Sequence, residues 1–225
     1  MLTDDILMAI HAKVLFQHDI ENRITRVNEP PFDLAPKVFI GATRLRNIVR
    51  FSSLLDENIV ERLEKVFEEN AGTDLAEVIK ILNEVGQVND FWMGPAFVFP
   101  DIKESNSSNI IQVKHENKAL LKPYFPYTFE DFEYKKPCFV VMKDNKPISI
   151  CCSARQTEEA AEASVFTNEN YRGKGYGIEV TNAWAAEVQR QGRVALYSTS
   201  WDNFASQALA RKLDLIQFGT DIHMG

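Results

Sequence analysis

Residues 171–178 read Tyr-Arg-Gly-Lys-Gly-Tyr-Gly-Ile and place a glycine at every second position from 173 to 177. An apolar run typical of a strand, Ala160 to Thr167, precedes this stretch, and apolar residues at helical spacing follow it. Glycines let the backbone of such a strand-to-helix turn aim several N–H groups at one point, and a helix N-terminus adds partial positive charge. Because Arg172 and Lys174 add two cations, the stretch predicts a cradle for an anion.

Two common nucleotide-binding motifs do not fit this stretch. A dinucleotide fingerprint, Gly-x-Gly-x-x-Gly, requires its third glycine at position 178, which is Ile178. A P-loop requires Ser or Thr after its lysine, and Lys174 is followed by Gly175. A glycine-rich turn with a purely structural role stays open as the alternative.

The hydrophobic pattern around the glycine stretch predicts a series of elements in the C-terminal half. They are a strand at 110–113, a short helix near 117–121, two strands in 138–155 around the polar turn 143–146, the strand 160–167, a helix ending near Gln191 before Gly192, a strand at 194–200, a helix within 202–213 and a closing strand at 215–224.

From about residue 136 to 224, this order of hairpin, strand, glycine loop, helix, strand, helix and strand resembles the GNAT superfamily of acyl-CoA-dependent N-acetyltransferases. The pyrophosphate loop of that family follows the pattern Arg/Gln-x-x-Gly-x-Gly/Ala, and Arg172, Gly175 and Gly177 match every fixed position. The resemblance implies a mixed α+β fold with a mostly antiparallel central sheet and flanking helices. It does not cover the first 90 residues or so, and we therefore expect an α+β subdomain over 1–90 and a GNAT-like domain over 91–225.

The resemblance also implies acetyl-CoA as co-substrate, a primary amine as acceptor and no metal. Backbone groups of Val165, Phe166 and Thr167 would pair with the pantetheine arm, and the Asn203 side chain would bond its amide, although Asn203 is equally suited to cap a helix. The pyrophosphate would lie on the loop formed by Arg172, Gly173, Lys174, Gly175, Tyr176, Gly177 and Ile178.

Direct attack of an amine on a thioester needs a base, a donor to the oxyanion and an acid for the leaving thiolate. Glu162 lies near where several family members place their base, although a carboxylate in a strand can also sit on a solvent-facing edge. The family often has a tyrosine seven residues after the asparagine as the acid, but that position is Ala210. Tyr197, Ser198 and Ser206 are the candidate substitutes, with water as another. Because this tyrosine is missing, a second function stays open, in which the protein is a non-catalytic acyl-CoA-binding or regulatory module.

The first 90 residues contain predicted elements but no catalytic motif, and a protein-interaction role is open for them. An amphipathic helix is expected over 2–17 with Ile6, Ile10 and Val14 on one face. A hairpin is expected from 37–41 and 47–51, followed by a helix capped by Asp56 and another capped by Thr73 and ending near Val85. The polar segment 100–109 is the best candidate for a boundary.

Composition places the chain among ordinary globular proteins of the cytoplasm. It has 225 residues, three cysteines, a net charge of −7 and a pI near 5.2, which argues against binding to nucleic acid or an anionic membrane. Cys151 and Cys152 are adjacent in an apolar strand, so one is expected in the core and the other exposed. Residues 171–212 have a net charge of +3, which suits a phosphate-rich co-substrate. The remaining residues have a net charge of −10, which suits a cationic amine. The oligomeric state is open, with a homodimer possible.

Overall fold

A computed structural model of the chain describes residues 2–69, 74–102 and 108–225. Its helices are α1 (Asp4–Leu15), α2 (Glu57–Glu69), α3 (Leu75–Leu82), α4 (Pro126–Glu130), α5 (Tyr176–Arg190) and α6 (Phe204–Lys212), with 3-10 turns at Lys118–Leu120, Phe132–Tyr134 and Glu169–Tyr171. Its strands are β1 (Phe16–His18), β2 (Ile24–Val27), β3 (Val38–Ala42), β4 (Asn47–Phe51), β5 (Phe91–Val98), β6 (Ile110–Val113), β7 (Cys138–Lys143), β8 (Lys146–Gln156), β9 (Ala160–Thr167), β10 (Val194–Ser198) and β11 (Ile216–Met224).

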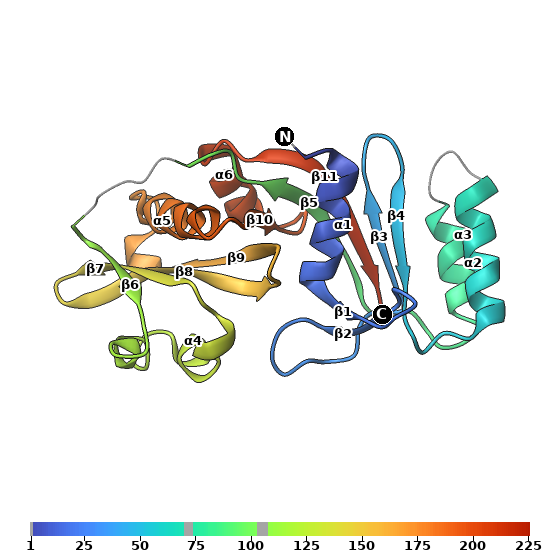
Figure 1. Cartoon of the computed structure of the whole chain (residues 1–225), viewed down its shortest axis with the longest axis horizontal. Coiled ribbons are helices and arrows are strands. Elements are labelled where there is room, and N and C mark those ends of the chain that lie inside the picture. The colour runs from blue at the N-terminus through green and yellow to red at the C-terminus, as the bar shows by residue number, and fades with distance from the viewer. Residues whose placement is uncertain (1, 70–73, 103–107) are drawn as a thin grey trace.

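Nine of these strands form one sheet in the order β4-β3-β11-β5-β10-β9-β8-β7-β6 (Figure 1). Every neighbouring pair is antiparallel except β9 and β10, which run parallel. β1 and β2 form a separate two-stranded sheet. The mixed α+β class with a mostly antiparallel sheet is therefore confirmed.

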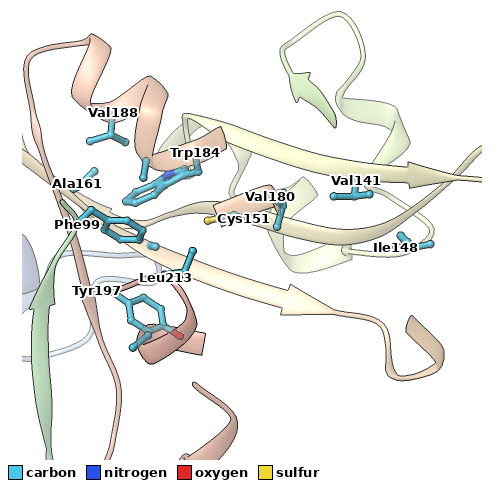
Figure 2. Packing of buried hydrophobic residues seen from close by; sticks show 14 residues of the cluster. Phe99, Val141, Ile148, Cys151, Ala161, Val180, Trp184, Val188, Tyr197 and Leu213 are labelled. Carbon is cyan, nitrogen blue, oxygen red and sulfur yellow. The ribbon is translucent and has the colours of Figure 1, made fainter. Parts of the chain in front are cut away.

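Helix α5 covers one face of the sheet through its apolar stripe. Trp184 is fully buried there, with its ring 5.8 Å from that of Phe99, and its Nε1 donates to Ser153 Oγ at 3.2 Å. Figure 2 shows Trp184 beside Cys151 and Val180, with Phe99 and Tyr197 nearby. Burying an aromatic side chain of this size stabilises a core by about 3 kcal/mol, so this cluster anchors α5 to the strands that precede and follow it.

Local signals place most helix ends and turns where the sequence predicts them. Asp56 caps α2 by accepting from the Ile59 amide at 3.0 Å, and Gly192 follows α5 with a φ of 76°. Helix α3 is capped by Asp74, which accepts from Glu77, while Thr73, the predicted cap, lies outside the described residues. Ile6, Ile10 and Val14 follow one another at i, i+4 spacing in α1 as predicted, but only Ile10 and Val14 are buried, whereas Ile6 is 47% exposed.

The cysteine prediction was also wrong, since Cys151 and Cys152 are both buried. Cys151 belongs to the cluster under α5, and Cys152 packs on the opposite face with Leu121 and Phe132 from the segment between β6 and β7. Both faces of β8 are therefore covered by other parts of the protein. Alternate side chains of a strand are exposed only where one face of the sheet meets water, so neither cysteine is exposed.

The sheet continues across residue 90. β3 pairs with β11 from Val38 opposite Met224 to Ala42 opposite Thr220, and α2 and α3 pack beyond it against β3 and β4 (Figure 1). The two-part division of the chain stays a prediction, but strands from both sides of the boundary share one hydrogen-bonded sheet. Among the described residues, no helix has the length and apolar character needed to cross a lipid bilayer.

Candidate active site

The parallel strands β9 and β10 separate partway along their length. They pair over three positions, ending at Glu162 opposite Leu196, and β9 then continues to Thr167 along β8. The Asn168 amide donates to Ile148 O at 2.9 Å, and bonding alternates along an antiparallel pair. The backbone groups of Val165 and Thr167 therefore face away from β8, toward the side on which β10 has diverged.

A cleft of about 470 Å³ opens at this point. It is walled by the end of β9, the glycine loop and one side of α6, and its lining residues are Val165, Phe166, Thr167, Tyr171, Arg172, Gly173, Gly175, Tyr176, Gly177, Ile178, Asn203, Ala205, Ser206, Ala208, Leu209 and Lys212. The structure thus brings together ten of the eleven residues predicted for the co-substrate.

Lys174 is the predicted residue that does not line the cleft. Its Nζ donates to Asn170 O at 3.0 Å and lies 5.4 Å from the centre of the Tyr171 ring. Sequence reasoning missed Tyr171 and four lining residues of α6, namely Ala205, Ala208, Leu209 and Lys212, whereas it named Ser206 as a candidate acid. The i, i+3 and i+4 spacing of Ala205, Ala208 and Leu209 was a usable signal, because such residues share one helix face.

The glycine loop needs its glycines for two different reasons. Gly173 and Gly175 have φ angles of 74° and 90°, which other residues adopt only with strain, and Gly175 directly precedes the first turn of α5. At Gly177 a Cβ would lie 3.3 Å from Thr167 Oγ1, so a side chain there would press against β9. The loop therefore keeps β9 close to the N-terminus of α5, where the first backbone N–H groups lack partners within the helix.

The cleft has a positive character. Arg172 and Lys212 are the charged residues among its described lining, and both are cations. Arg172 Nε donates to Thr167 O at 3.1 Å, and its guanidinium lies 5.8 Å from the centre of the Phe166 ring. A helix N-terminus and two cations at one cleft favour a phosphate-bearing ligand.

Two hydroxyl groups connect the core to the cleft. The Tyr197 phenol is hydrogen-bonded to Ser206 Oγ, and Ser206 lines the cleft. Burial raises the pKa of Tyr197, so the phenol keeps its proton at neutral pH. The Ser206 amide donates to Asn203 Oδ1 at 3.0 Å, so Asn203 does cap α6 and any ligand contact falls to its Nδ2. Ala210 is buried in the core under α5, at 1% exposure.

Glu162 occupies the point where β9 and β10 part, but it does not line the cleft. The solvent-edge alternative is wrong, because β9 lies between β8 and β10 and Glu162 is 4% exposed. Its carboxylate accepts from Ser198 Oγ at 2.5 Å and from Arg155 Nη1 at 3.4 Å. The Ser198 hydroxyl, which can pass a proton, therefore contacts the Glu162 carboxylate at the point where β9 and β10 separate.

Known proteins resemble this chain in sequence and in fold. The sequence profile of a family described as GNAT acetyltransferase matches residues 57–217. A GCN5-related N-acetyltransferase from Kribbella flavida superimposes with a TM-score of 0.53 at 15% identity, over 100% of this chain and 95% of its own. An acetyltransferase of the GNAT family from Colwellia psychrerythraea gives 0.52 at 10% identity, over 82% of this chain and 80% of its own.

A GNAT-family protein from Novosphingobium aromaticivorans gives a TM-score of 0.53 at 14% identity, over 61% of this chain and 65% of its own. At these identities the structural likeness concerns the fold alone. No curated protein matches the chain significantly.

Proposed function

The chain belongs to the GNAT acetyltransferase family, and from this premise we propose that it transfers the acetyl group of acetyl-CoA to a primary amine. Family membership gives acyl-CoA-dependent acetyl transfer as the general reaction. The observation that carries the specific proposal is the cleft where β9 leaves β10. It joins the edge of β9 that pairs with no other described strand to a glycine loop and two cations.

Each part of the cleft matches a part of the co-substrate. The outward-facing backbone of Val165 and Thr167 can pair with the amides of the pantetheine arm as an added strand would. The first amides of α5 and the side chains of Arg172 and Lys212 are suited to the phosphates. Phe166 contributes a half-exposed ring rather than backbone groups, because its amide faces β8.

The residues at the vertex supply the groups that the reaction needs. Glu162 accepts the ammonium proton through Ser198, to which it is hydrogen-bonded. The Val165 amide, which faces away from β8, donates to the developing oxyanion. Ser206 gives a proton to the leaving thiolate and is resupplied by Tyr197. Proton transfer by positioned groups contributes about 10² to 10⁴ in rate, so these side chains govern turnover more than binding.

Turnover against a panel of primary amines tests the proposal. Acetyl-CoA should raise the melting temperature, and release of free thiol should depend on an amine, with cationic amines favoured by the −10 charge outside residues 171–212. Glu162→Gln should keep the melting shift and lose about 100-fold or more in turnover at neutral pH. Absence of a melting shift at saturating acetyl-CoA would remove the proposal.

A second candidate, an acyl-CoA-binding module without catalysis, is favoured by buried Ala210, which puts no hydroxyl at the family's acid position. It predicts the same melting shift with no amine-dependent thiol release. Amine-dependent release that is lost in Glu162→Gln rejects it.

A further inference from the structure

A chain of alternating charges connects the N-terminal segment to Glu162. Lys135 Nζ lies 3.2 Å from Glu29 Oε2, Glu29 Oε1 accepts from Arg155 Nη2 at 2.8 Å, and Arg155 Nη1 reaches Glu162 Oε2 at 3.4 Å. The four side chains are between 5% and 27% exposed. Glu29 lies in the N-terminal segment, outside residues 57–217 that match the GNAT profile.

The two carboxylates share Arg155 unequally. The contact to Glu29 has the length of a strong charge-assisted hydrogen bond, whereas the contact to Glu162 is longer by 0.6 Å. An unshared guanidinium usually binds a carboxylate through two parallel N–H groups. In this protein Nη2 of Arg155 donates to Glu29, and only Nη1 reaches Glu162, at the longer distance.

This division matters because a base must be able to hold a proton. An arginine paired closely with a carboxylate lowers the pKa of that carboxylate by about 1 to 3 units, which weakens it as a base at neutral pH. Burial would raise the pKa of Glu29, but Arg155 and Lys135 outweigh burial and hold it below its usual value. Glu29 therefore keeps its negative charge and its hold on Arg155 across neutral pH.

We propose that Glu29 is a positioning residue for Glu162: it draws the Arg155 guanidinium away, so that Arg155 orients the Glu162 carboxylate without forming a full ion pair with it. The inference rests on the proposed role of Glu162 as the base. It assigns to the N-terminal segment a part in the reaction.

Other ionisable groups interact with Glu162 or with its charged neighbours, and they enter the test. They are Arg155 on β8, Tyr197 on β10, His11 on α1, Asp221 and His223 on β11, and Glu29 and Lys135 in the adjoining segments. Burial opposes the charge on His11, but Asp221 raises its pKa, and the charge of Glu162 acts on it as well, so each measurement is repeated in a His11→Asn background.

The direct experiment is a carbon-13 NMR titration of the glutamate side-chain carboxyls, with the Glu162 signal identified by its absence in Glu162→Gln. In Glu29→Gln, Arg155 is free to pair with Glu162, and the Glu162 titration should move down by roughly one pH unit. In Arg155→Gln it should move up. The matched control is Glu57→Gln, which removes the partner of Arg23 at 2.6 Å, an ion pair that does not include Glu162 or Arg155.

A double variant separates an effect carried by Arg155 from one acting directly through space. If Glu29 acts through Arg155, then Glu29→Gln should shift Glu162 by less than half as much in the Arg155→Gln background. If Arg155→Gln does not fold, Arg155→Lys replaces it. Lysine keeps the positive charge but cannot donate to two carboxylates through separate guanidinium nitrogens. An unchanged or upward titration of Glu162 in Glu29→Gln overturns the proposal.

Kinetics distinguish this inference from the proposed function. The acid limb of the pH profile of kcat/KM should move in the same direction as the NMR titration in each variant. If the wild type shows no amine-dependent turnover but the variants show the expected NMR shifts, the proposed function is wrong. The effect of Glu29 on Glu162 through Arg155 then still holds. Turnover with an acid limb that Glu29→Gln leaves in place means that Glu29 has no part in the reaction.

Discussion

His11 Nε2 and Asp221 Oδ2 lie 2.8 Å apart, and neither side chain is exposed to solvent. Burial would raise the pKa of Asp221, but the hydrogen bond from His11 and the proximity of His223, whose Nε2 lies 3.6 Å from Asp221 Oδ2, hold it at about 2. Burial likewise opposes the charge on His11, yet the hydrogen bond and the charge of Asp221 raise its pKa above 6.5. The pair connects α1 to β11 and so fixes the N-terminal helix on the sheet.

Asp221→Asn should lower the free energy of unfolding by about 3 to 5 kcal/mol near pH 6, because it breaks a buried pair and removes the charge that keeps His11 protonated in the core. Since the carboxyl pKa is depressed, its contribution is present above pH 3.8 and is lost as the pH falls toward 2. The raised pKa of His11 acts in the opposite direction, with a contribution present below pH 6.5 and lost as the pH rises through the folded-state value. The gap between wild type and variant in urea unfolding should therefore narrow at both ends of the pH range.

Glu84→Gln is the matched control for this measurement. It breaks the ion pair that Glu84 forms with Arg62 at 2.6 Å on the exposed outer side of α2 and α3. Surface pairs contribute little, so the urea midpoint should hardly move. Equal losses in the two variants would show that burial does not strengthen the His11–Asp221 pair.

Gly175→Ala and Gly192→Ala form a second matched pair. Both glycines have left-handed backbones, with φ of 90° and 76°, so each substitution should cost about 1 to 2 kcal/mol of stability. Only Gly175 lines the cleft and precedes α5. Isothermal titration with acetyl-CoA should give an affinity about tenfold or more weaker for Gly175→Ala, which displaces phosphate-binding amides, and no change for Gly192→Ala.

Arg172→Gln should raise the KM for acetyl-CoA by about tenfold with little change in kcat, because it removes one charge-assisted contact to a phosphate. The difference in KM between wild type and Arg172→Gln should become smaller as the salt concentration rises. Arg211→Gln is the comparison, since Arg211 lies on α6 directly beside Lys212 but outside the cleft lining. A similar KM change in both variants would mean that general positive charge, rather than a contact at Arg172, attracts the co-substrate.

Tyr197→Phe and Ser206→Ala should each lower kcat by about 10² with KM for acetyl-CoA nearly unchanged, because the two hydroxyls act in one proton path. The double variant should be little worse than either single one. Tyr134→Phe, at a 54% exposed tyrosine, controls for loss of a phenol elsewhere. Additive losses would place the two hydroxyls in separate roles.

The glycine loop and the elements around it could be predicted from sequence because their signals are local. Positive φ at Gly173 and Gly175, the Asp56 cap and the stripe that includes Trp184 each depend on residues within a few positions. The cleft followed from these, since a strand, a turn and a helix in succession necessarily meet at the loop between them.

Strand β5 was not predicted, because Gly94 and Pro95 interrupt its apolar pattern and both residues disfavour interior strands. The structure supplies the reason for the glycine: a Cβ at Gly94 would lie 1.8 Å from Thr199 O, where the chain leaving β10 crosses β5. Such a crossing joins residues more than 100 positions apart. The contact of Glu29 with Arg155, 126 positions away, was unpredictable for the same reason.

The position of β5 between β10 and β11 also determines how the protein can be divided. A cut in the 100–109 segment leaves β5 on one fragment and both of its sheet neighbours on the other. Each fragment then carries unpaired strand edges that only the other completes. The chain is thus suited to conditional reconstitution, in which two inactive pieces brought together by fused partners rebuild the sheet and report their encounter.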